Sequence, residues 1–128
     1  MPEENLASAL LAAQKEMKHP HRNKVNPHFK SKYADLTAVL DAIVPVFNAH
    51  GLVLTQSLEE GGLRTTLLHT SGQSLTSVTP VIVDKGGPQS FGSGVTYMRR
   101  YMAQAVAGIA ADDDDDGNAA TKANKENW

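Results

Sequence analysis

The chain has 128 residues, a formal net charge of −2 and no cysteine. This length suits one domain with a hydrophobic core rather than two. The lack of cysteine excludes disulfides and thiolate metal sites. No apolar run approaches membrane-spanning length and the N-terminus lacks a signal-peptide pattern, so we expect a cytoplasmic protein without a membrane partner.

The charge is distributed unevenly. Five lysines or arginines and no acid lie between Lys18 and Lys32, whereas Asp112 to Asp116 is a run of five acids. Residues from Asp112 onward hold six acids and two lysines, which leaves +2 on the remainder. We expect a single domain over residues 1–111 and an acidic, flexible tail over 112–128. A modestly basic body is compatible with nucleic-acid binding but does not require it.

Two helices are predicted in the first half of the chain. Apolar residues recur at helical spacing over residues 3–17, namely at Leu6, Leu10, Ala13 and Met17. A second stripe over residues 34–50 consists of Leu36, Val39, Leu40, Ile43 and Phe47. Asp35 is the expected N-cap of this second helix. Pro45 could kink or split it, and we expect one kinked helix.

Residues 19–33 between these helices, HPHRNKVNPHFKSKY, are predicted to form a polar, basic loop broken by prolines. Its basic side chains alternate with Phe29 and Tyr33, which would offer charge to phosphates and flat rings to bases. The plain alternative is a solvated loop with Phe29 inserted into the core. Three histidines also lie here, but no carboxylate is interleaved to complete a metal site, so we expect no metal.

Strand patterns follow over residues 52–57, 63–69 and 74–83. The first two are joined by a glycine-bearing turn and predict a hairpin. Pro80 gives the third strand an edge position or a bulge. The predicted fold class is therefore α+β, with a small antiparallel three-stranded sheet packed against helices.

The stretch GSGVTYMRRYMAQAVAG at residues 92–108 predicts a third helix, with Ser93 as a candidate N-cap. On a helical wheel one side carries a stripe that we expect to face the core, made of Val95, Met98, Met102, Ala105, Val106 and Ile109. The opposite side carries Thr96, Tyr97, Arg100 and Gln104. Arginines with a neighbouring tyrosine can pair with phosphate and stack on a base, but an ordinary solvated helix face is the competing interpretation.

No motif of an enzyme emerges. The chain contains no G-x-x-x-x-G-K-[ST] sequence, which argues against ATP-driven strand exchange. The aspartate run could hold Mg²⁺ as in a nuclease, but consecutive aspartates on a tail point in different directions. We expect neither catalysis nor a cofactor.

Four blocks of the sequence resemble the ERF (essential recombination function) proteins of bacteriophages. Residues 26–36, NPHFKSKYADL, and residues 92–101, GSGVTYMRRY, are similar to two blocks of that family. Residues 50–56, HGLVLTQ, match its helix-to-strand junction, and the acidic run with Gly117-Asn118 matches its acidic end. The chain departs from the pattern at Gly94, Met98 and Met102, where packing rather than chemistry is affected.

The resemblance implies an ATP-independent single-strand annealing protein that coats single-stranded DNA as a homo-oligomer, either a ring or a helical filament. It implies a core similar to that of the ring-forming annealing recombinases, a role in phage homologous recombination in the bacterial cytoplasm, and a phage exonuclease as partner. Under this hypothesis the DNA groove is lined by basic and aromatic residues, namely Lys24, Lys30, Lys32, Tyr33, Arg64, Lys85, Tyr97, Arg99 and Arg100.

Three alternatives stay open at this point. The chain could be an oligomeric interaction module with only minor DNA contact. The aspartate run could serve a metal-dependent nuclease. Arg99 or Arg100 could form salt bridges between subunits instead of contacting DNA, because arginine is also common in protein interfaces.

Overall fold

Three helices and two antiparallel sheets make up the part of the chain that the computed structural model describes, which is residues 3–27, 30–81 and 86–110. The first half contains α1 (Leu6–Glu16), β1 (Lys24–Val25), β2 (Lys32–Tyr33) and α2 (Leu36–Ala49). The second half contains β3 (Leu52–Glu59), β4 (Gly62–His69), β5 (Ser74–Thr79) and α3 (Pro88–Ala107).

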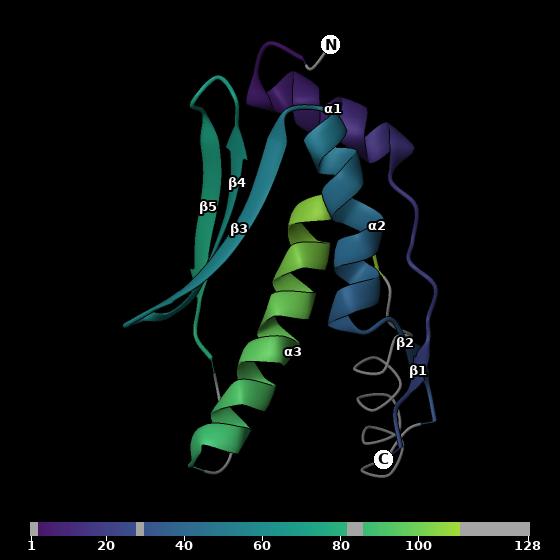
Figure 1. Cartoon of the computed structure of the whole chain (residues 1–128), viewed down its shortest axis with the longest axis vertical. Helices are drawn as coiled ribbons and strands as arrows, with labels where there is room; N and C mark the ends of the chain where they lie inside the picture. Colours follow the sequence, from purple (N-terminus) through teal and green to yellow (C-terminus); the bar gives the residue numbers. More distant parts are fainter. Residues whose placement is uncertain (1–2, 28–29, 82–85, 111–128) are drawn as a thin grey trace, which may run out of the picture.

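Helix α3 runs between α2 and the three-stranded sheet, and α1 crosses one end of the molecule (Figure 1). The predicted α+β class and its three-stranded antiparallel sheet, in the order β3-β4-β5, are confirmed. The small β1–β2 sheet was not predicted, because a pair of two-residue strands leaves no periodic pattern in the sequence.

The register of the sheet gives it an inner and an outer face. Leu54 of β3, Leu67 of β4 and Leu75 of β5 are direct cross-strand partners and therefore share the inner face that looks toward the helices. On the outer face Thr55, Thr66 and Thr76 form the corresponding row. Strand β5 lies at the edge of the sheet, which is one of the two placements expected from Pro80. It ends at Thr79, directly before Pro80, and is therefore shorter than the predicted strand over residues 74–83, because proline cannot donate to a ladder. Residues 82 and 83 lie outside the described part of the chain.

The first two helices form largely as predicted. The Asn5 side chain accepts a hydrogen bond from the Ser8 amide and starts α1, and Asp35 caps α2 by accepting from the Ala38 amide. Helix α2 is continuous through Pro45, whose side chain is exposed. The prediction of one helix, and not two pieces, is therefore confirmed.

Two predictions about α3 are wrong. The helix begins at Pro88, with Gly87 as its N-cap, so Ser93 lies inside the helix and does not cap it. Proline suits the first turn, where its missing amide has no intrahelical partner in any case. Gly108 adopts a left-handed conformation and ends the helix, as expected for a glycine at this position.

The face of α3 that is buried is also different from the predicted stripe. Its buried residues are Arg100, Ala103, Gln104 and Ala107, whereas Ala105 is exposed and Met98 and Met102 are only partly covered. The helix is covered on two sides, by α2 and by the sheet, so small side chains that allow a close approach are buried in preference to the long methionines.

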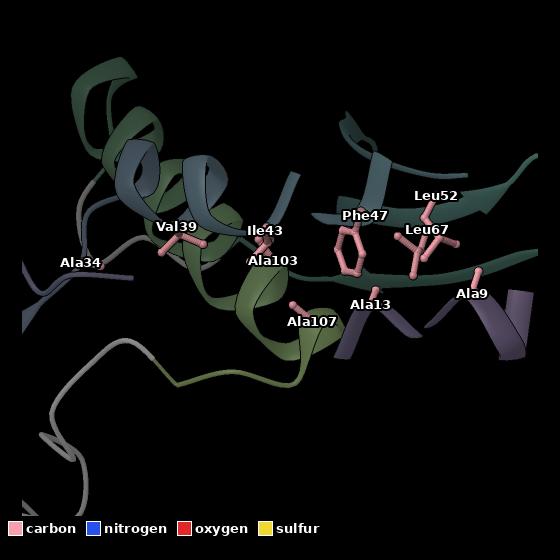
Figure 2. Close-up of a cluster of buried hydrophobic side chains, with 10 residues drawn as sticks. All are labelled: Ala9, Ala13, Ala34, Val39, Ile43, Phe47, Leu52, Leu67, Ala103 and Ala107. Carbon is pink, nitrogen blue, oxygen red and sulfur yellow. The ribbon is translucent and has the colours of Figure 1, made fainter. Parts of the chain in front are cut away.

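The hydrophobic core follows α2 from end to end (Figure 2). In that view Ala34 and Val39 lie at one end, Ile43 lies beside Ala103 of α3, and Phe47 lies near the sheet residues. Ala9 and Ala13 of α1 close the other end, next to Leu52 and Leu67. Each of these side chains is fully buried, so the core fixes how the three helices and the sheet meet.

A partly exposed ionic contact joins the two ends of the α1 region to His50, the C-cap of α2. His50 Nδ1 lies 2.9 Å from Glu3 Oε2, and His50 Nε2 lies 3.1 Å from Glu16 Oε2. The carboxylates of Glu16 and Glu3 raise the pKa of His50 above its ordinary value of 6.5. The hydrogen bond to His50 lowers the pKa of Glu3 below its ordinary value of 4.5.

We expect this contact to make stability depend on pH. The raised His50 pKa contributes stability that is complete below pH 6.5 and is lost as pH rises through the folded-state pKa. The lowered Glu3 pKa contributes stability that is complete above pH 4.5 and is lost in more acidic solution. Urea unfolding should therefore show that His50→Gln reduces the midpoint more at pH 5.5 than at pH 8.5. Exposed His21→Gln is the control, and an equal loss at both pH values would contradict the prediction.

Gly62, the first residue of β4, is expected to be intolerant of a side chain. Its φ is +135°, and a Cβ at this position would run into the carbonyl oxygen of Thr79 and approach the Cα of Pro80. We expect Gly62→Ala to lower the free energy of unfolding by at least about 2 kcal/mol, from strain and steric clash together. Gly61→Ala, whose Cβ meets only the Val78 methyl at 4.0 Å, should change it by less than about 0.5 kcal/mol. Equal urea midpoints for the two variants would refute this account.

Candidate nucleic-acid interface

The β1–β2 hairpin gathers three of the predicted lysines. Lys24 pairs with Tyr33 and Val25 pairs with Lys32, and the side chains of Lys24, Lys30 and Lys32 are all exposed. The turn is closed by Asn26, whose amide donates to the Ser31 carbonyl at 2.7 Å and whose carbonyl accepts from the Lys30 amide at 2.7 Å. Lys30 adopts a left-handed conformation with φ of 56°. The described part of the loop predicted from the sequence therefore contains a two-pair antiparallel ladder, and three exposed lysines lie on or beside it.

The hairpin is connected to the start of α2. The Asp35 amide donates to Asn23 Oδ1 at 3.0 Å, and Ala34 between the hairpin and the helix is fully buried. The hydrogen bond from the Ala38 amide holds the pKa of Asp35 below its ordinary value, and the nearby charges of Lys24 and Arg100 act in the same direction. The N-terminus of α2 is thus also the base of the basic hairpin.

Arg100 of α3 lies within a group of tyrosine rings, and we call these four residues the Arg100 cluster. The guanidinium carbon is 4.8 Å from the ring centre of Tyr33, 5.0 Å from that of Tyr101 and 5.5 Å from that of Tyr97. Arg100 is only 8% exposed. The prediction that Arg100 lies on a free polar face is therefore wrong, because the hairpin and the neighbouring tyrosines cover its guanidinium.

Tyr97 and Tyr101 complete the cluster from the same helix. Their ring centres are 4.5 Å apart with an interplanar angle of 39°. Tyr97 is 48% exposed, whereas Tyr33 and Tyr101 are partly buried. The cluster holds every tyrosine of the chain and presents one of them to solvent.

Arg99 is directed toward the sheet and not toward the hairpin. Its Nε donates to Gln56 Oε1 at 3.4 Å, and the Gln56 amide in turn donates to the Arg99 carbonyl and to Thr65 Oγ1, each at 3.1 Å. Arg99 is partly buried in this position. The two adjacent arginines, which were predicted to line one groove, thus connect α3 to different parts of the fold.

Arg64 is not placed with the hairpin either. Arg64 lies on the outer face of the sheet and forms two hydrogen bonds with Glu59, Nε to Oε2 at 2.8 Å and Nη2 to Oε1 at 2.9 Å. This pairing raises the pKa of Arg64 and lowers that of Glu59. The sheet and the hairpin lie on opposite sides of α3 in Figure 1. Lys85 lies outside the described residues, as do His28, Phe29 and the aspartate run.

The structure therefore brings together six of the nine predicted residues, namely Lys24, Lys30, Lys32, Tyr33, Tyr97 and the enclosed Arg100. Three contributing residues are not predicted from the sequence, namely Tyr101, which adds a ring beside Arg100, Asn23, which holds the base of the hairpin, and Gln56, which holds Arg99. One helix face carries residues at the spacing i, i+3, i+4 and i+7, namely Tyr97, Arg100, Tyr101 and Gln104. This spacing in the sequence could have predicted that Tyr101 lies beside Arg100.

Among the described residues, no group of three or more histidines and acids is arranged to hold a metal ion. No helix in the same residues combines the length and the apolar character needed to cross a bilayer.

A family model described as the ERF superfamily matches residues 6–127. The chain belongs to the ERF superfamily. This confirms the resemblance drawn from the four sequence blocks, two of which form the hairpin with the start of α2 and the middle of α3. No curated protein and no solved structure matched the chain. ERF membership points to a recombination-related role for the chain.

Proposed function

We propose that this ERF protein binds single-stranded DNA and anneals complementary strands without ATP during phage homologous recombination. The observation that carries the proposal is the convergence of the exposed lysines of the β1–β2 hairpin with the tyrosines of the Arg100 cluster. Lysines neutralise phosphates, and exposed rings stack on bases without regard to sequence.

The arrangement suits annealing because it separates these two tasks. Three exposed lysines lie on or beside the short β1–β2 ladder, so a DNA strand would be held mainly by its backbone. One half-exposed ring, Tyr97, is available to stack on or wedge between bases. Most bases would then stay free to pair with a second strand.

In this proposal the protein acts in stoichiometric amounts, with neither a cofactor nor a catalytic step. It works in the bacterial cytoplasm, where a phage exonuclease supplies the single strands. We also propose that β3, β4, β5 and α3 correspond to the core of the ring-forming annealing recombinases, since the order hairpin, strand and helix is the same.

We further propose that the protein assembles into a homo-oligomer, either a ring or a helical filament. Residues 88–99 of α3 include no buried side chain, although Phe91, Val95 and Met98 are apolar. Phe91 is 45% exposed and lines a pocket of about 200 Å³ together with Leu58, Pro80 and Val81. This segment also contains Gly92 and Gly94, which have a low helix propensity. Packing against a second copy of the chain would therefore explain why it is helical.

The first test of the proposed function is the salt dependence of binding and annealing. A fluorescent oligothymidine should bind with an affinity that falls steeply with salt, and complementary strands should anneal faster with protein and no ATP. Lys24→Ala should make the slope of log affinity against log salt shallower by about 0.7, the value for one phosphate contact on a single strand. Lys15→Ala on α1 is the matched control and should leave the slope unchanged. An equal effect of both substitutions would place the DNA elsewhere, and salt-independent or absent binding would favour the interaction module.

The proposed assembly is tested by light scattering after size exclusion. The unmodified protein should elute as a multimer, and Phe91→Glu should reduce its mass to that of the monomer, because a buried carboxylate without a partner is costly. Leu11→Glu changes a somewhat more exposed apolar residue on α1 and should leave the multimer intact. A monomeric unmodified protein, or equal dissociation by both variants, would reject this interface.

A further inference from the structure

We propose that Arg100 is a positioning residue that clamps the lysine-bearing hairpin onto α3 and does not itself contact DNA. The inference rests on the function proposed above. It assigns the enclosed Arg100 a role different from that of the exposed lysines of the hairpin.

Access to the guanidinium supports this assignment. Three rings lie within 4.8 to 5.5 Å of it, and they come from two separate segments, Tyr33 on β2 and Tyr97 with Tyr101 on α3. With 8% of the residue exposed, a phosphate could reach the guanidinium only after a ring had moved away. A planar cation held among rings gains most where water is excluded, and this favours the intramolecular contact.

The hairpin needs such a fastening. Its ladder has only two residue pairs, and a short isolated hairpin is marginal in water. Tyr33, the residue that contacts Arg100, is the direct cross-strand partner of Lys24 and the neighbour of Lys32 in the chain. Fixing the Tyr33 ring against α3 therefore fixes the direction in which both lysines point.

Positioning also explains why the contact uses arginine and tyrosine instead of an apolar pair. The cation adds positive potential beneath the hairpin, and its charge helps hold the pKa of Asp35 low at the capped start of α2. Tyr97 stacks on Tyr101 while remaining half exposed, so the ring that is offered to DNA belongs to the same cluster that holds the hairpin. A loosened cluster would disturb the lysines and the stacking ring together.

The deciding experiment compares Arg100→Lys, which keeps the charge, with Arg100→Met, which keeps the approximate length. Both should weaken oligothymidine binding about tenfold without changing the salt slope, because lysine stacks poorly among rings and the misplaced hairpin lowers the binding-competent fraction. Hydrogen exchange at the Lys24, Val25 and Lys32 amides should increase in both variants. Affinity is measured below the unfolding midpoint of each variant, so that global instability cannot produce the loss.

A second pair of variants tests the same contact from the hairpin. Tyr33→Leu should reproduce the loss in affinity, and Tyr33→Phe, which keeps the ring face, should restore most of it. The double variant Arg100→Met with Tyr33→Leu should be no worse than either single change, because both break one contact.

Three results would overturn the proposal. One is near-normal affinity in Arg100→Lys together with a slope shallower by about 0.7 in Arg100→Met, which is the signature of a direct phosphate contact. Another is unchanged hairpin exchange in both arginine variants. The third is an unmodified protein that binds no DNA, which would refute both the proposed function and the role of Arg100 in DNA binding. In that case the hydrogen-exchange data would still show separately whether Arg100 holds the hairpin against α3.

Discussion

The packing of α3 between α2 and the three-stranded sheet is the constraint on which the rest of the structure depends. The helix can approach α2 closely because Ala103 and Ala107 leave almost no side chain in the way. On the sheet side, Gln56 bonds to the α3 backbone at Arg99. Neighbouring positions on a helix point about 100° apart, so Arg99 and Arg100 must serve different surfaces once the helix is fixed. Two adjacent arginines that suggest one basic patch in the sequence therefore make contacts with two different parts of the fold.

Enclosing the charged Arg100 and the polar Gln104 in a helix interface would be costly if their polar groups had no partners. The Gln104 amide donates to the Arg100 carbonyl at 3.1 Å, and the Arg100 guanidinium is surrounded by tyrosine rings. One of these rings, Tyr33, belongs to the hairpin, so its contact with Arg100 also joins the hairpin to the helix. The requirement to satisfy a buried cation and the requirement to order a weak hairpin are therefore met by one set of residues.

The exposed surfaces of α3 follow one another along the helix. Its first turns carry Phe91, which lines the pocket beside the β3–β4 turn, and about two turns later Tyr97 reaches the Arg100 cluster. A subunit contact at Phe91 and a DNA contact at Tyr97 would therefore lie only about two helical turns apart on α3. Assembly and DNA binding are expected to influence each other through α3, since both depend on how this helix is held.

The sequence by itself determined the α+β class, α1, α2, the three strands and their order, because each has a clear apolar period and recognisable caps or turns. It also indicated the family, through blocks that are local in the chain. Only the tertiary structure decided which face of α3 is buried, since α2 and the sheet both compete for it and the small residues pack closer than the methionines. The same packing turned Arg100 inward and left Arg64 with Glu59 on the far face of the sheet. A single chain pattern records residue types and spacing, but it does not record which distant side chain will cover a given face.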